Sequence, residues 1–264
     1  MTAHHHSPED DWTWRAWAKD LHAALATQTR LPVAQLAAGA ALSPRARRAY
    51  PIIGAFTGLA AGGVFFAGHD VGLPVAVNAV LAVAALILIG GHMDDHGNRA
   101  AAPFMVATLL KIASLYVIGN TATPGGGPHM VVLTLVSAGA LSNAAAILLA
   151  PAEEPDDSDD PEDDPKVVIL PPDGTHIPGD DTAEGNGRDL GVAATATAIA
   201  LAIAALALGL IAGSVAAAGA AVGVWLAPRL LAREIEAETL PLPLALQQSG
   251  EVWALLSLAI AMQI

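Results

Sequence analysis

The stretch LGVAATATAIALAIAALALGLIAGSVAAAGAAVGVWLAP occupies residues 190–228 and contains no Asp, Glu, Lys or Arg. A helix needs about 20 apolar residues to cross a bilayer. These 39 residues are therefore nearly enough for two crossings. Gly209, Gly213 and Ser214 lie near the middle, where small residues permit a sharp reversal of the chain. The stretch predicts a tight hairpin of two membrane-spanning helices.

Five further segments are apolar enough to cross a membrane. Residues 49–68, 71–91 and 130–151 carry no charged side chain. Residues 100–119 contain only Lys111, and the C-terminal stretch to Ile264 has Glu251 inside it or at its edge. Together with the hairpin they predict an all-α fold, a polytopic membrane helical bundle of about seven transmembrane helices.

The distribution of basic residues predicts the orientation of this bundle. Eleven of the 12 Lys and Arg residues precede the first span or follow the second, fourth or sixth, and Lys111 alone lies inside a span. Because basic loops stay on the cytoplasmic side, the N-terminus is expected in the cytoplasm and the C-terminus outside. So few basic residues also make a nucleic-acid-binding surface improbable. The absence of cysteine excludes disulfides and thiolate chemistry.

The N-terminal segment predicts a helix that lies on the membrane surface. Its apolar side chains recur at helical spacing, at Trp14, Trp17, Leu21 and Leu25, while Asp20 and its basic neighbours fall elsewhere on the helix. Tryptophan prefers the headgroup level, which favours an interfacial helix on the inner leaflet. The alternative is an ordinary amphipathic helix that packs on a core.

A strongly acidic segment divides the chain. Residues 153–189 hold 14 acidic and two basic residues, which accounts for 12 of the 13 net negative charges. Such a composition does not bury enough apolar surface to fold alone, so a disordered cytoplasmic loop is expected. The predicted organisation is an N-terminal segment, four spans, the acidic loop and three spans, over residues 1–48, 49–151, 152–189 and 190–264.

Residues 90–97, GGHMDDHG, are the most informative for chemistry. They directly follow an apolar span and bring His92, Asp94 and Asp95 to the predicted cytoplasmic surface. Carboxylates suit Mg²⁺, which is often held by one or two of them together with substrate phosphates. The alternative is a polar turn that merely ends a span.

Three further charged groups are candidates for a site. Lys111 lies about three turns into a span, where an ammonium is costly unless it is paired. It is expected either to hold a phosphate or to pair with Glu251. Glu238 is a possible extra ligand for a cation, although taken alone it is better explained as part of a solvated helix end. Arg30 closes the N-terminal helix, where a guanidinium can bind phosphate.

These pieces, in this order, resemble the cobalamin synthase family, the adenosylcobinamide-GDP ribazoletransferases. The resemblance is carried by five short motifs, at residues 29–32 (TRLP), 51–58 (PIIGAFTG), 90–94 (GGHMD), 109–111 (LLK) and 238–240 (ETL). The acidic motif is one residue shorter than the family pattern and lacks its further aspartates.

The resemblance implies a Mg²⁺-dependent transferase of the bacterial inner membrane. It would join α-ribazole, or its 5′-phosphate, to adenosylcobinamide-GDP and release GMP. Its partners would then be corrinoid and nucleotide substrates, the lipid bilayer, and either a second copy or other cobamide-assembly proteins. Asp94, Asp95 and Glu238 would hold the metal, His92 would orient substrate or act as base, and the substrate-binding residues would be Arg30, Lys111 and Glu251.

Two alternatives stay open. The shortened acidic motif motivates a non-catalytic relative that binds partners or corrinoid intermediates. The two charges inside spans, Lys111 and Glu251, motivate a small transporter, because intramembrane charges often mark pathways.

Overall fold

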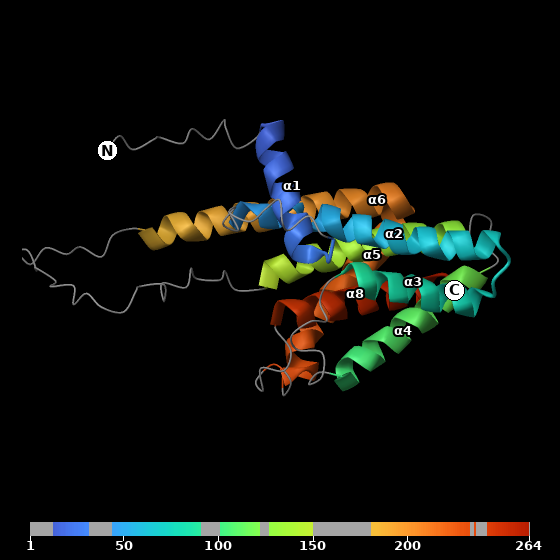
Figure 1. Ribbon diagram of the computed structural model, residues 1–264. Helices are drawn as coiled ribbons and strands as arrows, with labels where there is room; N and C mark the ends of the chain where they lie inside the picture. The colour runs from blue at the N-terminus through green and yellow to red at the C-terminus, as the bar shows by residue number, and fades with distance from the viewer. Residues whose placement is uncertain are drawn as a thin grey trace, which may run out of the picture.

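The computed structural model describes residues 13–31, 44–90, 101–121, 127–149, 181–232, 235 and 242–263. Within these ranges the regular secondary structure is entirely helical, and the all-α prediction is confirmed. The elements are, in order, α1 (Trp14–Gln28), the 3-10 helix η3 (Pro44–Ala49), α2 (Tyr50–Asp70), α3 (Val75–Ile89), α4 (Ala101–Asn120), α5 (Pro128–Leu149), α6 (Asp181–Leu230) and α8 (Leu242–Ala261) (Figure 1).

Helices α2 and α3 form an antiparallel pair joined by a short turn. Pro51 lies in the first turn of α2, where its missing N–H costs nothing. The turn after Asp70 uses Gly72 at φ 81°, a left-handed conformation that suits glycine. The fully buried Asn78 donates from Nδ2 to the carbonyl of Leu73 at 3.1 Å and fastens this turn. The C-terminal end of α3 is thereby returned toward the start of α2.

Helix α6 reverses direction at Gly209, as the sequence predicts. This residue has φ 81° and ψ 170°, which is not helical. A Cβ added at Gly213 would lie 3.1 Å from the carbonyl oxygen of Ala204, so the two halves of α6 lie side by side. Leu206, at the tip of the hairpin, is 88% exposed. The hairpin is therefore a pair of adjacent helices with an apolar tip.

Substituting Gly209 with alanine is expected to destabilise the hairpin by about 1–3 kcal/mol, because its backbone conformation is nearly restricted to glycine. Thermal unfolding of the purified protein in detergent measures the effect. Gly191→Ala is the matched control, since that glycine is helical and has open space around its Cβ position. Equal melting temperatures for the two variants would contradict the strained reversal.

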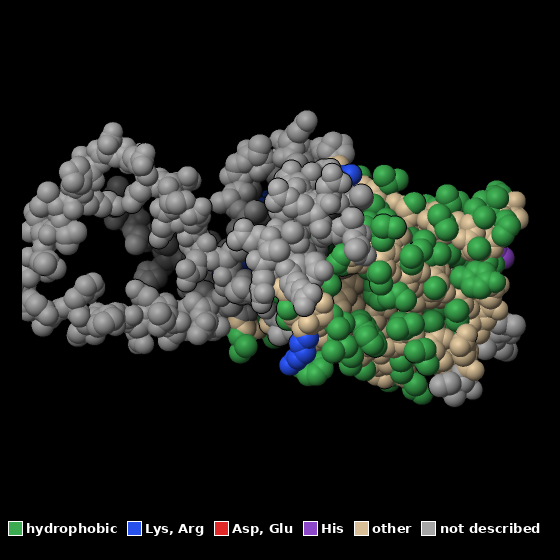
Figure 2. All heavy atoms as spheres, turned by 90° about the horizontal axis from the view of Figure 1, so that it is seen from below, with side chains coloured by type: hydrophobic (Ala, Val, Ile, Leu, Met, Phe, Trp, Pro, Cys, Tyr) green, Lys and Arg blue, Asp and Glu red, His purple; other side chains and the backbone are tan. Residues whose placement is uncertain are grey.

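Long apolar helices make this a membrane protein. Four helical stretches of the described chain meet the length and hydropathy of a span, at Arg45–Asp70, Pro103–Asn120, Pro128–Leu148 and Leu190–Leu230. The last of these stretches folds back on itself at Gly209, and α3 is a shorter apolar helix. Helix α8, which carries Glu251, is not among the stretches that meet these criteria, so the number of about seven spans stays a prediction. Hydrophobic side chains cover the side of the bundle seen in Figure 2, and Lys and Arg side chains appear near its border with the residues that are not described.

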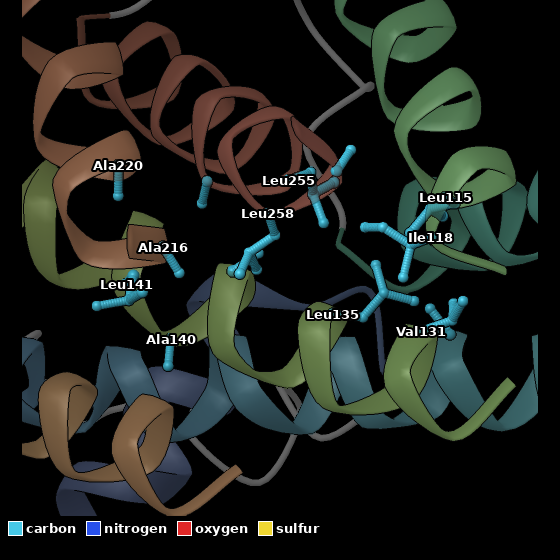
Figure 3. Packing of buried hydrophobic residues seen from close by; sticks show 14 of the residues in the cluster. Leu115, Ile118, Val131, Leu135, Ala140, Leu141, Ala216, Ala220, Leu255 and Leu258 are labelled. Atoms are coloured by element: carbon cyan, nitrogen blue, oxygen red, sulfur yellow. The ribbon is translucent and has the colours of Figure 1, made fainter. Parts of the chain in front are cut away.

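The bundle packs through small residues. Helix α5 is central and lies against α2, α6 and α8. The largest buried cluster is mostly Ala and Leu, and in Figure 3 Leu135 of α5 lies with Leu115 and Ile118 of α4 and Leu258 of α8. In lipid, where apolar surface alone does not drive association, small residues let the helix backbones approach closely.

Two sequence expectations differ from the structure. The segment expected to be disordered to residue 189 is helical from Asp181 onward. The helix of the apolar span continues toward the N-terminus into the acidic segment. Acidic residues are favourable near a helix N-terminus, where they interact with the helix dipole. Asp20, expected away from the packing face of α1, is buried, because it meets a buried arginine from η3. Helix α1 itself forms as predicted and lies across the other helices (Figure 1), whereas its interfacial position remains a prediction.

Candidate functional site

Lys111 and Glu251 form a buried ion pair inside the bundle. The lysine lies on α4 and the glutamate on α8, with 2.7 Å between Nζ and Oε2. Lys111 is 5% exposed and Glu251 is 7% exposed. Of the two outcomes left open for Lys111, pairing with Glu251 is confirmed.

Gln248 completes this polar contact. Its Oε1 accepts from Lys111 Nζ at 2.7 Å, and it lies one helical turn before Glu251 on the same face of α8. Among the described residues Lys111 therefore has two side-chain partners for three N–H donors. A third donor is available for a ligand.

The pair lines a small cavity between the helices. The cavity has a volume of about 60 Å³ and is partly open to the outside. That volume holds a few water molecules or part of a phosphate group, but no nucleotide. Five helices contribute its lining, which consists of Thr57, Val83, Leu86, Ile87, Gly90, Phe104, Thr108, Lys111, Gly139, Ser142, Asn143, Gln247, Gln248 and Glu251.

Helix α5 adds a polar wall that the sequence analysis missed. Ser142 and Asn143 are buried, and both donate to the carbonyl of Gly139, at 3.1 and 2.9 Å. Their only signal in the sequence is a pair of polar residues within an uncharged span. Within the described part of the chain the Asn143 amide donates from Nδ2, and its Oδ1 is an acceptor that suits a ligand in the cavity.

The end of α1 lies beside the wall of this cavity. The backbone N–H of Arg30 donates to the carbonyl of Ile89 at 3.0 Å. Ile89 ends α3, and the next residue, Gly90, lines the cavity. The Arg30 side chain is exposed. Residues 29–31 and the start of the GGHMD motif are thus brought together, although 60 residues separate them in the sequence.

The predicted metal ligands Asp94, Asp95 and Glu238, and the predicted catalytic His92, lie outside the described residues. The described ranges contain no cluster of three or more potential metal-ligating side chains. The structure therefore brings together Lys111 and Glu251 and bonds the backbone of Arg30 to Ile89, the residue before Gly90 of the cavity lining. The remaining site predictions stay predictions.

A second buried ion pair was also missed from the sequence. Arg48 of η3 binds Asp20 of α1, with Nε and Nη2 each 2.7 Å from Oδ2. The guanidinium also lies over the ring of Trp17, 4.2 Å from its centroid. Nothing in the spacing of two residues 28 positions apart indicates this contact.

Part of the chain matches a known protein family. The profile of the cobalamin-5-phosphate synthase family matches residues 20–97. The N-terminal part of the chain is similar to this family. The matched range includes the TRLP, PIIGAFTG and GGHMD motifs, so the resemblance stated from the sequence is confirmed over that range.

Two curated relatives agree with the family match. The chain is 30% identical over 126 residues to an adenosylcobinamide-GDP ribazoletransferase of Azorhizobium caulinodans, over 46% of this chain and 48% of the relative. It is 44% identical over 59 residues to one of Brucella anthropi, over 22% of this chain and 23% of the relative. The chain thus spans about half the length, or less, of the curated relatives it matches. No solved structure matches it.

Proposed function

We propose that this protein is a membrane transferase of cobalamin synthesis that joins α-ribazole, or its 5′-phosphate, to adenosylcobinamide-GDP and releases GMP. The proposal is supported mainly by the position of three segments that resemble the family. Gly90 and Lys111 both line the cavity, and the backbone of Arg30 bonds to Ile89, the residue before Gly90. The names of the relatives supply the substrates.

The reaction is a phosphoryl transfer. A hydroxyl of the ribazole attacks the phosphorus that remains attached to adenosylcobinamide, the bond from that phosphorus to GMP breaks, and the hydroxyl proton goes to a base. Because such transfers depend mainly on positioning and on neutralising charge, cationic donors near the phosphates carry much of the catalysis. The remaining N–H of Lys111 is aligned for this role by its two partners, and the guanidinium of Arg30 suits a second phosphate.

Asp94 and Asp95 are the proposed ligands of Mg²⁺, with Glu238 as a further one. Two peptide units separate Gly90 from His92 and four separate it from Asp94, and chains of these lengths span at most about 7 and 14 Å. These carboxylates thus belong to a segment that leaves directly from the cavity wall, and their oxygens fit a hard cation. When bound, the ion neutralises charge on the transferred phosphoryl group. His92 is the proposed base or orienting group.

The site is proposed to face the cytoplasm at the inner membrane. Arg15, Lys19, Arg30 and Arg229 are exposed, and the first three belong to the segment before the first span. This pattern favours a cytoplasmic position by the positive-inside rule. Lys111 and Glu251, the two charges that motivate the transporter alternative, form an ion pair with each other.

Synthesis by the full chain in proteoliposomes tests the proposal. Wild-type protein with adenosylcobinamide-GDP, α-ribazole and Mg²⁺ is expected to release GMP, whereas Asp94→Asn is expected to fall to background because a metal ligand is lost. Asp70→Asn is the matched control, since this exposed carboxylate ends α2 at the side of the bundle away from Gly90. No GMP release from folded wild type would favour the non-catalytic relative instead.

A further inference from the structure

The junction between α1 and the rest of the protein is built around a buried charge pair. Asp20 is 8% exposed and Arg48 is 7% exposed, and one carboxylate oxygen receives both Nε and Nη2 of the arginine. Trp17 covers the other side of the guanidinium. Arginine is suited to this arrangement, because its planar fork binds a carboxylate in a fixed direction while its face stacks on an aromatic ring.

The apolar contact at this junction is small. Its buried members are Ala24, Ala49 and Ile53, with Leu25 and Tyr50 partly buried beside them. Alanine methyl groups interlock weakly, so this contact by itself would permit α1 to slide or turn. A buried ion pair adds little net stability compared with a well-packed apolar pair, but it is satisfied in only one geometry. The ion pair therefore fixes the register of α1, that is, its position along its own axis and its rotation about that axis relative to η3 and α2.

The register of α1 sets the position of the residues at its C-terminal end. The helix stops at Thr29, whose N–H and hydroxyl both bond to the carbonyl of Leu25. The next residue, Arg30, bonds through its backbone to Ile89 beside the cavity. A helix rises 1.5 Å per residue, so Gln28, the last residue of α1, lies roughly 12 Å from Asp20 along the helix axis, and Arg30 follows two residues later. Any shift at Asp20 is transmitted to Arg30.

We propose that Asp20 and Arg48, covered by Trp17, are positioning residues that hold Arg30 at the rim of the Lys111 cavity. The proposal rests on the proposed function in one respect, namely that Arg30 binds a phosphate of the nucleotide substrate. The pair does not touch the substrate. It acts through α1, by keeping the backbone N–H of Arg30 bonded to the carbonyl of Ile89 at the end of α3.

The experiment compares two variants, a double and a single one, that remove the directional contact between Asp20 and Arg48 in different ways. Asp20→Leu/Arg48→Met replaces the pair with apolar groups, which commonly preserves folding. Arg48→Lys keeps the charge but loses the fork and the flat face. Lys19→Met is the control, because Lys19 is an exposed cation adjacent to Asp20 on the same helix.

The first readout is hydrogen exchange of the Arg30 amide, which needs no activity. This amide is expected to exchange at least about ten-fold faster in both pair variants than in wild type and Lys19→Met, since a lost charge-assisted contact is worth that factor. The second readout is steady-state kinetics, where KM for adenosylcobinamide-GDP is expected to rise about ten-fold while kcat stays within about two-fold.

Each readout overturns a different claim. Unchanged protection of the Arg30 amide in the double variant overturns the positioning role. Faster exchange with an unchanged KM overturns Arg30 as the group that is positioned. An inactive wild type overturns the proposed function, while amide exchange still decides the positioning role.

Discussion

Glu251→Gln is expected to destabilise the protein by about 3–5 kcal/mol and to abolish GMP release. The substitution leaves the Lys111 ammonium buried without a counter-charge, and the loss of one partner of a buried pair costs this much. Thermal unfolding in detergent and product formation in proteoliposomes are the two measurements. Glu251 is buried on α8. Glutamine has nearly the same volume as glutamate, so the substitution changes the charge at this position without changing the packing.

A double substitution separates the structural role of this pair from its chemical role. Lys111→Met/Glu251→Leu removes both charges, and apolar replacement of a whole buried pair is often neutral or stabilising. We expect this variant to recover a melting temperature close to wild type and to remain inactive, because the N–H donor for the substrate phosphate is gone. Recovery of activity together with stability would show that Lys111 has only a structural role.

Gly58→Ala is the second substitution with a large expected effect, about 3 kcal/mol or more. A Cβ at this position overlaps the carbonyl group of Leu135 on α5, which is backbone and cannot turn aside. Gly54 meets the backbone of Gly139 in the same way, and a Cβ at Gly62 would lie 2.8 Å from Val132 Cα. The three glycines, spaced by four residues, form the seam along which α2 touches α5.

The seam also supports the cavity. Thr57 of α2 and Gly139 of α5 line it, so separating the two helices would open the site as well as the core. The matched control is Gly63→Ala, on the same helix, where no atom lies within 4 Å of the added Cβ. Melting temperature and GMP release are measured for both variants. Equal effects of the two substitutions would contradict the close approach of α2 and α5.

Much of the fold is readable from composition along the chain. A bilayer demands long uncharged helices, so charge-free runs reveal the spans without any knowledge of tertiary contacts. The reversal of α6 is also local, because a long apolar run with Gly209 at its centre exceeds one bilayer thickness. Helix ends agree to within a few residues except at α6, which continues back to Asp181 through acidic sequence.

The candidate site was only partly readable. Lys111 is a clear signal in the sequence because an isolated charge in an apolar span is costly, and Glu251 is a possible partner in another apolar segment. Residues without such a penalty gave weaker signals: Ser142 and Asn143 are neutral, and Arg48 lies among other basic residues before the first span. The family match at residues 20–97 supports the motifs near Arg30 and Gly90, and Lys111 and Glu251 lie beyond it.

The apolar runs, the hairpin at Gly209 and the cost of burying Lys111 follow from the sequence alone, because each depends on local composition and on the bilayer. The choice of partners is visible only in the folded chain, where Lys111 meets both Glu251 and Gln248, Asp20 turns inward to Arg48, and the N–H of Arg30 bonds to Ile89. These contacts join residues 28 to 140 positions apart. Their partners are selected by how the helices pack, and the small residues along α2 and α5 set how closely they pack.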